Sequence, residues 1–230
     1  MKIRSIRAVQ VVLPKKEPKT PARRESWRHS APIGLPMNKY PEFPPGVPGK
    51  SPGIGGRAVW VQVVAEDGTW GLGRTGFGEP VAALVDSFYA PLLEGRDFFA
   101  TEHLNDMMWR ASKRHGSLGL SACAQSAVDL ALWDIRGKHF GEPIHRLLGG
   151  KRHNKIRAYA SILFGRDGAE TADIGRRWIE AGYTAVKFGW KPLGENEKLD
   201  LELVEGARRG IGEGNDVLID AGCCWDTMTA

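Results

Sequence analysis

Apolar and polar residues alternate over two stretches near the N-terminus, and this pattern predicts β-strands. Residues 3–13 alternate moderately and are rich in Val and Ile, and residues 57–65 alternate more strongly. A turn signal, Glu-Asp-Gly, follows at 66–68. Residues 69–74 are therefore expected to return as the second arm of a hairpin.

Helical spacing replaces this alternation from residue 79 onwards. Apolar residues recur every three or four positions from Val81, and a second helix is expected to begin at Thr101, a residue type that caps helices well, and to stop near Gly116. A third helix over 121–139 is apolar on most sides, which predicts that it is buried. A sheet followed by helices is an α+β pattern.

After residue 150 the pattern changes to alternating strands and helices. The expected strands are 156–161, 184–190 and 216–221, and the expected helices are 169–181 and 198–211. Such alternation predicts a parallel sheet. Three strands cannot close a barrel, and an eightfold barrel takes about 250 residues. We therefore expect the chain to be truncated in this part.

Composition adds one unusual segment to an otherwise ordinary globule. The chain has 230 residues, 42% hydrophobic and 26% charged, with three cysteines, which excludes a wholly disordered chain and a small disulfide scaffold. Residues 14–56 hold eight basic and three acidic residues and ten of the 14 prolines, so they account for the whole net charge of +5. We interpret 14–56 as a long basic loop. A loop that closes over an anionic small molecule explains this charge at least as well as nucleic-acid binding, which is disfavoured because no fold is signalled there.

The sequence also bears on location. The longest stretch free of charged residues and histidine, 116–128, is well short of the roughly 20 apolar residues of a membrane span. The apolar run at 8–13 is too short for a secretory signal. With an odd number of cysteines, the cytoplasm is the expected location.

Two motifs have simpler interpretations than the chemistry they suggest. Residues 71–76 match G-x-G-x-x-G, but they lie in a hairpin arm rather than in a strand–turn–helix, so a dinucleotide site is disfavoured. Asp129, Trp133 and Asp134 on the third helix are interpreted as caps and ion pairs. The six histidines show no zinc-ligand spacing.

Lys187 and Asp220 are the candidate site residues, because both lie late in predicted parallel strands, where α/β proteins build their sites. The period of two puts Lys187 and Gly189 on one face of their strand, and Asp220 and Gly222 on one face of theirs. A charged side chain among apolar neighbours is costly unless it is paired or bound to a metal. Two interpretations stay open at this point: an ion pair that only fills the interior, or a functional site.

Two segments, 127–138 and 141–150, closely resemble the region that joins the capping domain to the barrel in the enolase superfamily, in its mandelate racemase and muconate lactonizing enzyme branch. Residues 159–161, 182–187 and 217–222 agree with the first three barrel strands of that family. The resemblance implies an α+β N-terminal capping domain followed by the first part of a TIM-type (β/α) barrel, incomplete and with about three strands. The implied domains are 1–125, including the loop 14–56, and 126–230.

The resemblance also implies an activity. Members of the family remove the proton next to a carboxylate, and Mg²⁺ stabilises the enediolate that forms. By match to the family, Asp220 would be the first magnesium ligand. Lys187 would be a catalytic residue, the first lysine of a Lys-x-Lys motif, whose charge offsets the substrate carboxylate.

Two positions depart from the family pattern: Gly189 replaces the second lysine, usually the base, and Gly222 replaces an asparagine. A base is then expected from a histidine on a later strand, as in acid-sugar dehydratases, and racemisation is less favoured. The implied partner is a small-molecule carboxylate, a sugar acid. Oligomers are common in this family, so the resemblance is also compatible with a homo-oligomer.

The other ligands would lie beyond residue 230, so the chain alone is expected to be inactive, because one carboxylate does not hold Mg²⁺ usefully. Two alternatives stay open: a basic protein that binds anions or nucleic acid through 14–56, or a non-catalytic remnant.

Overall fold

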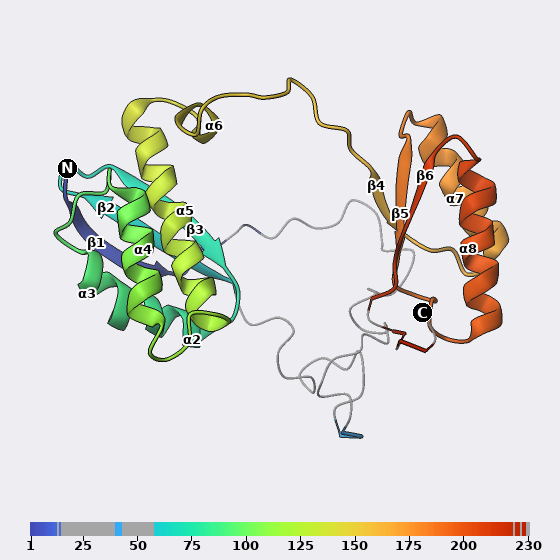
Figure 1. Cartoon of the computed structure of the whole chain (residues 1–230), viewed down its shortest axis with the longest axis horizontal. Coiled ribbons are helices and arrows are strands. Elements are labelled where there is room, and N and C mark those ends of the chain that lie inside the picture. Colours follow the sequence, from blue (N-terminus) through green and yellow to red (C-terminus); the bar gives the residue numbers. More distant parts are fainter. Residues whose placement is uncertain (13, 15–39, 43–57, 223, 226, 229–230) are drawn as a thin grey trace. The chain divides into compact units, whose positions relative to one another are not determined.

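The computed structural model describes residues 1–12, 14, 40–42, 58–222, 224–225 and 227–228. The chain divides into two compact units, and each is described by itself (Figure 1). The described residues of the first unit are 1–12, 14 and 58–154, and those of the second are 40–42 and 155–228 with the gaps just given. The basic loop expected over 14–56 therefore lies, apart from residues 14 and 40–42, outside the described residues.

The first unit contains an antiparallel sheet with the strand order β1-β2-β3. Its strands are β1 (Ile3–Val9), β2 (Val59–Ala65) and β3 (Trp70–Thr75). In the central strand β2 every second residue is buried, because one face of the sheet packs on helices while the other faces outward. The strands expected from the alternating pattern are thus confirmed.

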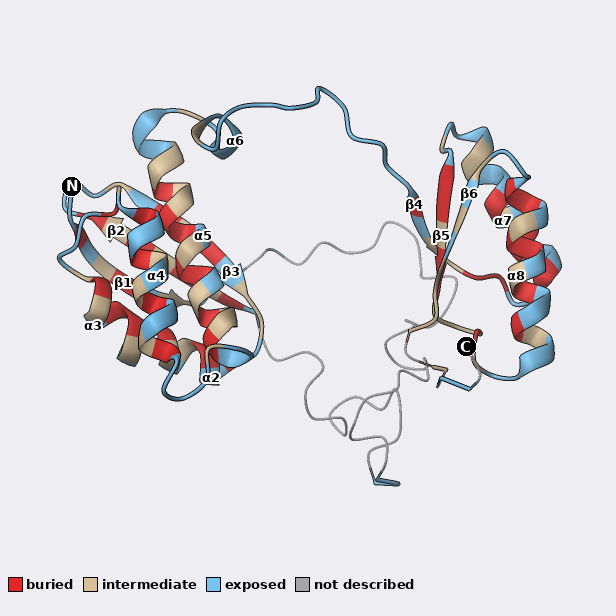
Figure 2. Cartoon of the chain, viewed as in Figure 1, coloured by how far each residue is buried: buried red, intermediate tan, exposed pale blue. Residues whose placement is uncertain are grey.

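Helices cover one face of this sheet (Figure 2). The helices of the first unit are α2 (Gly78–Leu84), the π-helical turn η2 (Val85–Tyr89), α3 (Ala90–Leu93), α4 (Thr101–Ser112), α5 (Leu120–Phe140) and α6 (Ile144–Leu147), of which α6 buries no residue and packs on α5. The expected cap at Thr101 is wrong: Ala100 precedes the helix, and the Thr101 hydroxyl donates to the Phe98 carbonyl oxygen at 3.2 Å instead.

The glycines of the G-x-G-x-x-G match allow α5 to lie unusually close to β3. A Cβ on Gly71 would overlap the carbonyl oxygen of Ala131, and a Cβ on Gly73 would overlap that of Ala127. These two glycines are therefore explained by helix-on-sheet packing rather than by a phosphate. Asp134 joins the same elements, because its Oδ2 accepts the Leu72 N–H at 2.8 Å.

Asp134 also pairs with Lys138 at 2.7 Å, and Asp129 accepts a hydrogen bond from the Asn105 amide at 2.9 Å. Both acidic residues of α5 are thus engaged in contacts that hold helices and sheet together. This agrees with their interpretation as structural residues.

The second unit contains a parallel sheet with the order β4-β5-β6, made of β4 (Ala160–Leu163), β5 (Ala185–Gly189) and β6 (Asp216–Asp220). Two helices, α7 (Gly168–Glu180) and α8 (Glu197–Ile211), connect the strands in turn. Figure 1 shows both helices on the same side of the sheet, and the core between the layers contains Val186, Phe188 and Leu203. This strand–helix alternation is consistent with a partial barrel.

The first of these strands begins later than its sequence predicts. The pattern indicated 156–161, whereas β4 starts at Ala160 and Ile156 is 87% exposed. Arg157 lies between Ile156 and the strand. Its guanidinium donates to the Thr184 carbonyl oxygen at 2.9 Å and pairs with the Asp216 carboxylate at 2.7 Å. Side-chain contacts of this kind carry no periodic signal, so the pattern could not locate the strand start.

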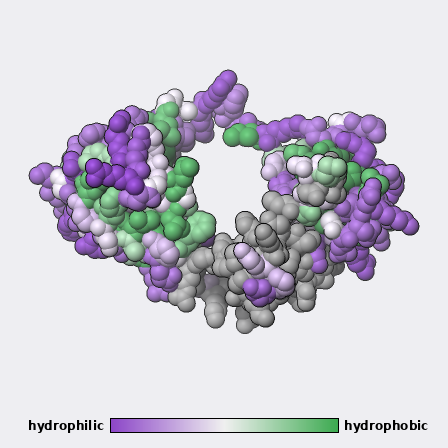
Figure 3. Space-filling model, turned by 60° about the horizontal axis from the view of Figure 1, so that its bottom comes forward, coloured by the Kyte–Doolittle hydropathy of each residue, from purple (hydrophilic) through white to green (hydrophobic). Residues whose placement is uncertain are grey.

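The division between the units falls after Asn154, whereas the boundary expected between residues 125 and 126 lies inside α5. Because α5 packs against β2, β3 and α4, the whole helix belongs to the first compact unit. Charged residues occupy the outward positions of α7 and α8, and much of the second unit's visible surface is hydrophilic (Figure 3).

Among the described residues, no helix has both the length and the apolar character needed to cross a bilayer.

Candidate functional site

The side chain of Lys187, in the middle of β5, meets that of Asp220, the last residue of the neighbouring parallel strand β6. Lys187 Nζ lies 2.7 Å from Asp220 Oδ2, and the two side chains are 27% and 30% exposed. Gly189 is the register partner of Asp220, and Lys187 is that of Leu218, so all four residues share one face of the sheet. That face is opposite to the one covered by α7 and α8. The structure therefore brings together the two residues that the sequence singled out, while their roles stay a prediction.

The ion pair shifts both groups towards their charged forms. The hydrogen bond with Asp220 raises the pKa of Lys187, against a smaller opposing effect of burial. The same bond lowers the pKa of the Asp220 carboxyl, and the Gly222 N–H, which donates to Oδ1 at 3.1 Å, lowers it further. At neutral pH the site therefore holds one ammonium and one carboxylate side by side.

The segments that follow β5 and β6 interlock beside this pair. Trp190 has a φ of 70°, and its N–H donates to the Asp220 carbonyl oxygen at 3.2 Å. Gly222 has a φ of 60°, and a Cβ placed on it would lie 2.7 Å from Trp190 Cδ1. The Trp190 ring thus occupies the space that any side chain at 222 would need, which explains why glycine stands there. A positive φ at a tryptophan leaves no signal in the sequence.

Gly189 has room for one side-chain carbon beside Asp220. A Cβ at this position would meet Asp220 Cβ at 3.5 Å, an ordinary van der Waals contact, and its φ is not in the left-handed region. Backbone geometry therefore does not require a glycine here. With glycine at position 189, Lys187 is the residue of β5 that carries a functional group on this face.

Asp200, in the first turn of α8, is a site neighbour that sequence reasoning missed. Its side chain is almost fully buried, its Oδ1 accepts the Gly194 N–H at 2.8 Å, and its Oδ2 accepts the Trp225 indole N–H at 2.9 Å. One signal could have identified it: a carboxylate three residues before Leu203 and seven before Ala207 stands on the inward face of a helix.

The described residues do not by themselves complete a magnesium site. Asp220 offers oxygen atoms, the ligand type that Mg²⁺ prefers. However, no group of three or more His, Cys, Asp or Glu side chains with metal-binding geometry occurs among the residues that the structure describes. One carboxylate of the right chemistry is present, and its partner in the structure is Lys187.

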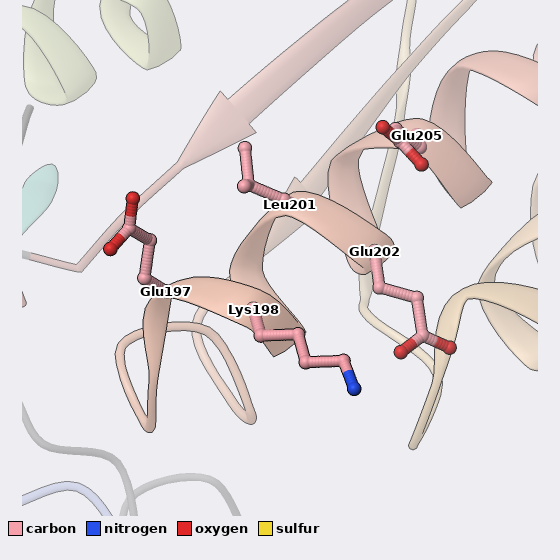
Figure 4. A pocket seen from close by; sticks show the side chains of 5 residues that line it. All are labelled: Glu197, Lys198, Leu201, Glu202 and Glu205. Carbon is pink, nitrogen blue, oxygen red and sulfur yellow. The ribbon is translucent and has the colours of Figure 1, made fainter.

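A shallow depression of about 450 Å³ lies elsewhere in the second unit, on the outer side of α8 (Figure 4). It is lined by Glu197, Lys198, Leu201, Glu202 and Glu205. All five residues come from this one helix, and none belongs to the strand-end site. Glu202 Oε1 accepts the N–H of Gly168, the first residue of α7, at 3.2 Å, and the other charged side chains belong to the exposed face of an amphipathic helix.

Comparison with known proteins gives the first unit a family. Residues 55–149 match the family model described as the mandelate racemase / muconate lactonizing enzyme, N-terminal domain. This range spans β2 to α6 and so covers most of the first unit.

Curated relatives extend the match into the second unit. The chain is 36% identical to D-galactarolactone cycloisomerase of Agrobacterium fabrum over 71% of its own length and 43% of the relative's. It is 40% identical to L-rhamnonate dehydratase of Saccharopolyspora erythraea, over 56% and 33% of the two lengths. It is 32% identical to arabinonate dehydratase of Saccharolobus solfataricus, over 71% and 44%. The chain thus spans less than half the length of these relatives.

Solved structures agree. A Bordetella bronchiseptica RB50 protein, named provisionally as a mandelate racemase, superposes with a TM-score of 0.71 at 26% identity, over 96% of this chain and 51% of that one. A mandelate racemase/muconate lactonizing protein from Paracoccus denitrificans PD1222, solved in complex with magnesium, gives 0.59 at 29% identity, over 71% and 47%. The chain therefore belongs to the mandelate racemase/muconate lactonizing enzyme branch of the enolase superfamily, as a partial match to its sugar-acid dehydratases and cycloisomerases.

Proposed function

We propose that this chain forms part of a magnesium-dependent lyase that removes the proton next to the carboxylate of a sugar acid and then releases the β-hydroxyl as water. The C–H electron pair forms the enediolate, and its collapse expels the hydroxyl, which leaves with a proton as water. The observation that carries the proposal is the ion pair between Lys187 of β5 and Asp220 at the end of β6. Two of the three relatives named above are dehydratases, which favours this outcome over cycloisomerisation.

Each residue of the pair has a definite role in this proposal. Asp220 supplies one of the oxygen ligands of Mg²⁺, a role for which its lowered pKa keeps it ionised. Lys187, kept protonated by its raised pKa, offsets the charge of the substrate carboxylate. When bound, Mg²⁺ would supply the positive charge that stabilises the enediolate.

The base is proposed to come from outside β5. Gly189 carries no group that accepts a proton. A side chain built on this position would start beside Asp220. A histidine on another strand is the proposed base. With a base on one face of the substrate only, the enzyme would eliminate rather than racemise.

The 230-residue chain by itself is proposed to be inactive. Its described residues offer one carboxylate at the strand ends, and Mg²⁺ gives up its hydration water reluctantly. No turnover of a panel of sugar acids with Mg²⁺ is therefore expected from this chain alone, and measurable turnover would overturn this part of the proposal. The alternative of an anion- or nucleic-acid-binding protein depends on 14–56, which lies mainly outside the described residues.

The reaction type is tested in a chimera. The chain replaces the matching segment of the Saccharolobus solfataricus arabinonate dehydratase, and the rate with ordinary arabinonate is compared with the rate for arabinonate deuterated at C2. A lower rate with the deuterated acid, together with loss of water from the product, supports proton abstraction followed by elimination. An active chimera whose substrate keeps its C2 deuterium in the product would contradict it.

A further inference from the structure

Asp200 is a buried carboxylate whose hydrogen-bond partners lie in two different segments. Only 8% of the residue is exposed. Its Oδ1 accepts from Gly194, in the segment that follows β5, and its Oδ2 accepts from Trp225, in the segment that follows β6. The two oxygens of one side chain thus join two stretches that lie about 30 residues apart in sequence.

A carboxylate in this position needs a specific reason. Removing a charged group from water is costly, and the hydrogen bonds given above come from neutral N–H groups. Bonds from such donors to a carboxylate are stronger than neutral ones and are directional. An apolar residue would pack between α8 and the sheet without that cost, but it would fix neither donor.

Both segments held by Asp200 also touch Asp220. The segment after β5 begins with Trp190, whose N–H donates to the Asp220 carbonyl oxygen at 3.2 Å. The segment after β6 includes Gly222, whose N–H donates to Asp220 Oδ1 at 3.1 Å. Asp200 therefore fixes the far ends of two segments whose near ends hold the candidate metal ligand.

Gly222 and Trp225 lie three residues apart in sequence, in the segment that follows β6. The Cys224 N–H donates to the Ala221 carbonyl oxygen at 3.1 Å, which closes a tight turn immediately after β6. Because Trp225 follows Gly222 so closely in sequence, a displacement of the Trp225 indole is expected to disturb the Gly222 N–H as well.

We infer that Asp200 is a positioning residue of the strand-end site: its carboxylate ties Gly194 to Trp225 and thereby sets the orientation of the Asp220 carboxylate. The inference deepens the proposed function, on which it rests for the role of Asp220. The hydrogen bonds themselves do not depend on that role.

Amide hydrogen exchange in the chain tests it with two variants. Asp200→Asn retains one oxygen for Gly194 but turns an amide donor towards the Trp225 indole. Trp225→Phe removes the indole donor and keeps a smaller aromatic ring. Each variant is expected to speed exchange of the Gly222 and Trp190 amides about tenfold, the effect of losing one contact of 1.4 kcal/mol, with little change at Val186 in the core of β5.

The double variant and a matched control distinguish a positioning role of Asp200 from a general contribution to the stability of the second unit. Asp200→Asn with Trp225→Phe is expected to exchange no faster than either single variant, because both remove the same bond. Trp178→Phe, in the same core cluster but on α7, is expected to speed exchange evenly across the second unit. An even increase in Asp200→Asn, or an unchanged Gly222 amide in both variants, would overturn the inference.

The proposed function fails separately. Selective loss of protection at Gly222, combined with a chimera that remains active after Asp220→Ala, would leave Asp200 as a positioning residue and remove the metal role of Asp220. Unchanged protection at Gly222, together with an inactive Asp220→Ala chimera, would remove the positioning role of Asp200 and leave the metal role of Asp220.

Discussion

Lys187 pairs with Asp220 diagonally across the sheet: the two Cα positions are not register partners, yet Nζ and Oδ2 are 2.7 Å apart. Asp220 lies directly opposite Gly189, two residues further along β5. A Cβ on Gly189 would have atoms of Asp220 and Ile162 as its nearest neighbours, so the ion pair leaves this position unoccupied by the lysine.

The pH dependence of stability follows from this pair. The lowered pKa of Asp220 gives stability that is present above its unfolded value near 3.8 and is lost as the pH falls through the folded pKa. The raised pKa of Lys187 gives stability that is present below its unfolded value near 10.5 and is lost as the pH rises through the folded pKa.

Lys187→Met should therefore lower the free energy of unfolding between about pH 5 and pH 9, by a small and salt-sensitive amount because the pair is solvent-accessible. Once the pH falls below the lowered pKa of folded Asp220, the two proteins should converge. Urea denaturation across pH checks this, and a constant difference at every pH would contradict the assignment.

Restoring a lysine at the family position tests the space at Gly189. Gly189→Lys should fold with nearly unchanged thermal stability, because the added Cβ meets Asp220 Cβ at an ordinary 3.5 Å. The second ammonium should lower the pKa of the Asp220 carboxyl further and bring that of Lys187 down, since two cations then share one carboxylate. Carbon-13 NMR titration of both side chains measures this.

The control is Gly189→Ala, which adds the Cβ without a charge and should leave both pKa values close to those of the parent. A Gly189→Lys protein that fails to fold while Gly189→Ala folds would show that the space ends at the first carbon.

Close packing of α5 on β3 gives a prediction for the first unit. Gly73→Ala places a methyl group on the Ala127 carbonyl oxygen, so the helix must move away from the sheet. The free energy of unfolding is expected to fall by about 3 kcal/mol, the upper part of the usual range for overpacking. Gly76→Ala is the matched control, since a Cβ there meets nothing within 4 Å. Equal stability of the two variants would contradict the packing account.

Sequence periodicity was sufficient for most elements and for the faces they present. The alternation around Val61 and Val63 predicted β2, and the period of two placed Lys187 and Asp220 where their side chains could meet. The resemblance around 127–150 then identified the family, which the comparisons confirmed.

The contacts around the pair could not be predicted in the same way. The bond between Asp200 and Trp225 joins residues 25 positions apart through an irregular segment, where no periodicity constrains geometry. The positive φ of Trp190 is set by its packing against Gly222 and not by its own preference. Loop geometry of this kind depends on tertiary contacts that single positions do not encode.

The role of the ion pair is tested most directly by activity in the arabinonate dehydratase chimera. Asp220→Ala and Lys187→Met are compared with Asp216→Asn, which alters an exposed carboxylate at the opposite end of the same strand. We expect Asp220→Ala to abolish turnover and its dependence on Mg²⁺, Lys187→Met to lower turnover at least a hundredfold, on the order of one lost charge contact in the transition state, and Asp216→Asn to act like the parent. Full, magnesium-dependent turnover by Asp220→Ala would contradict the central claim.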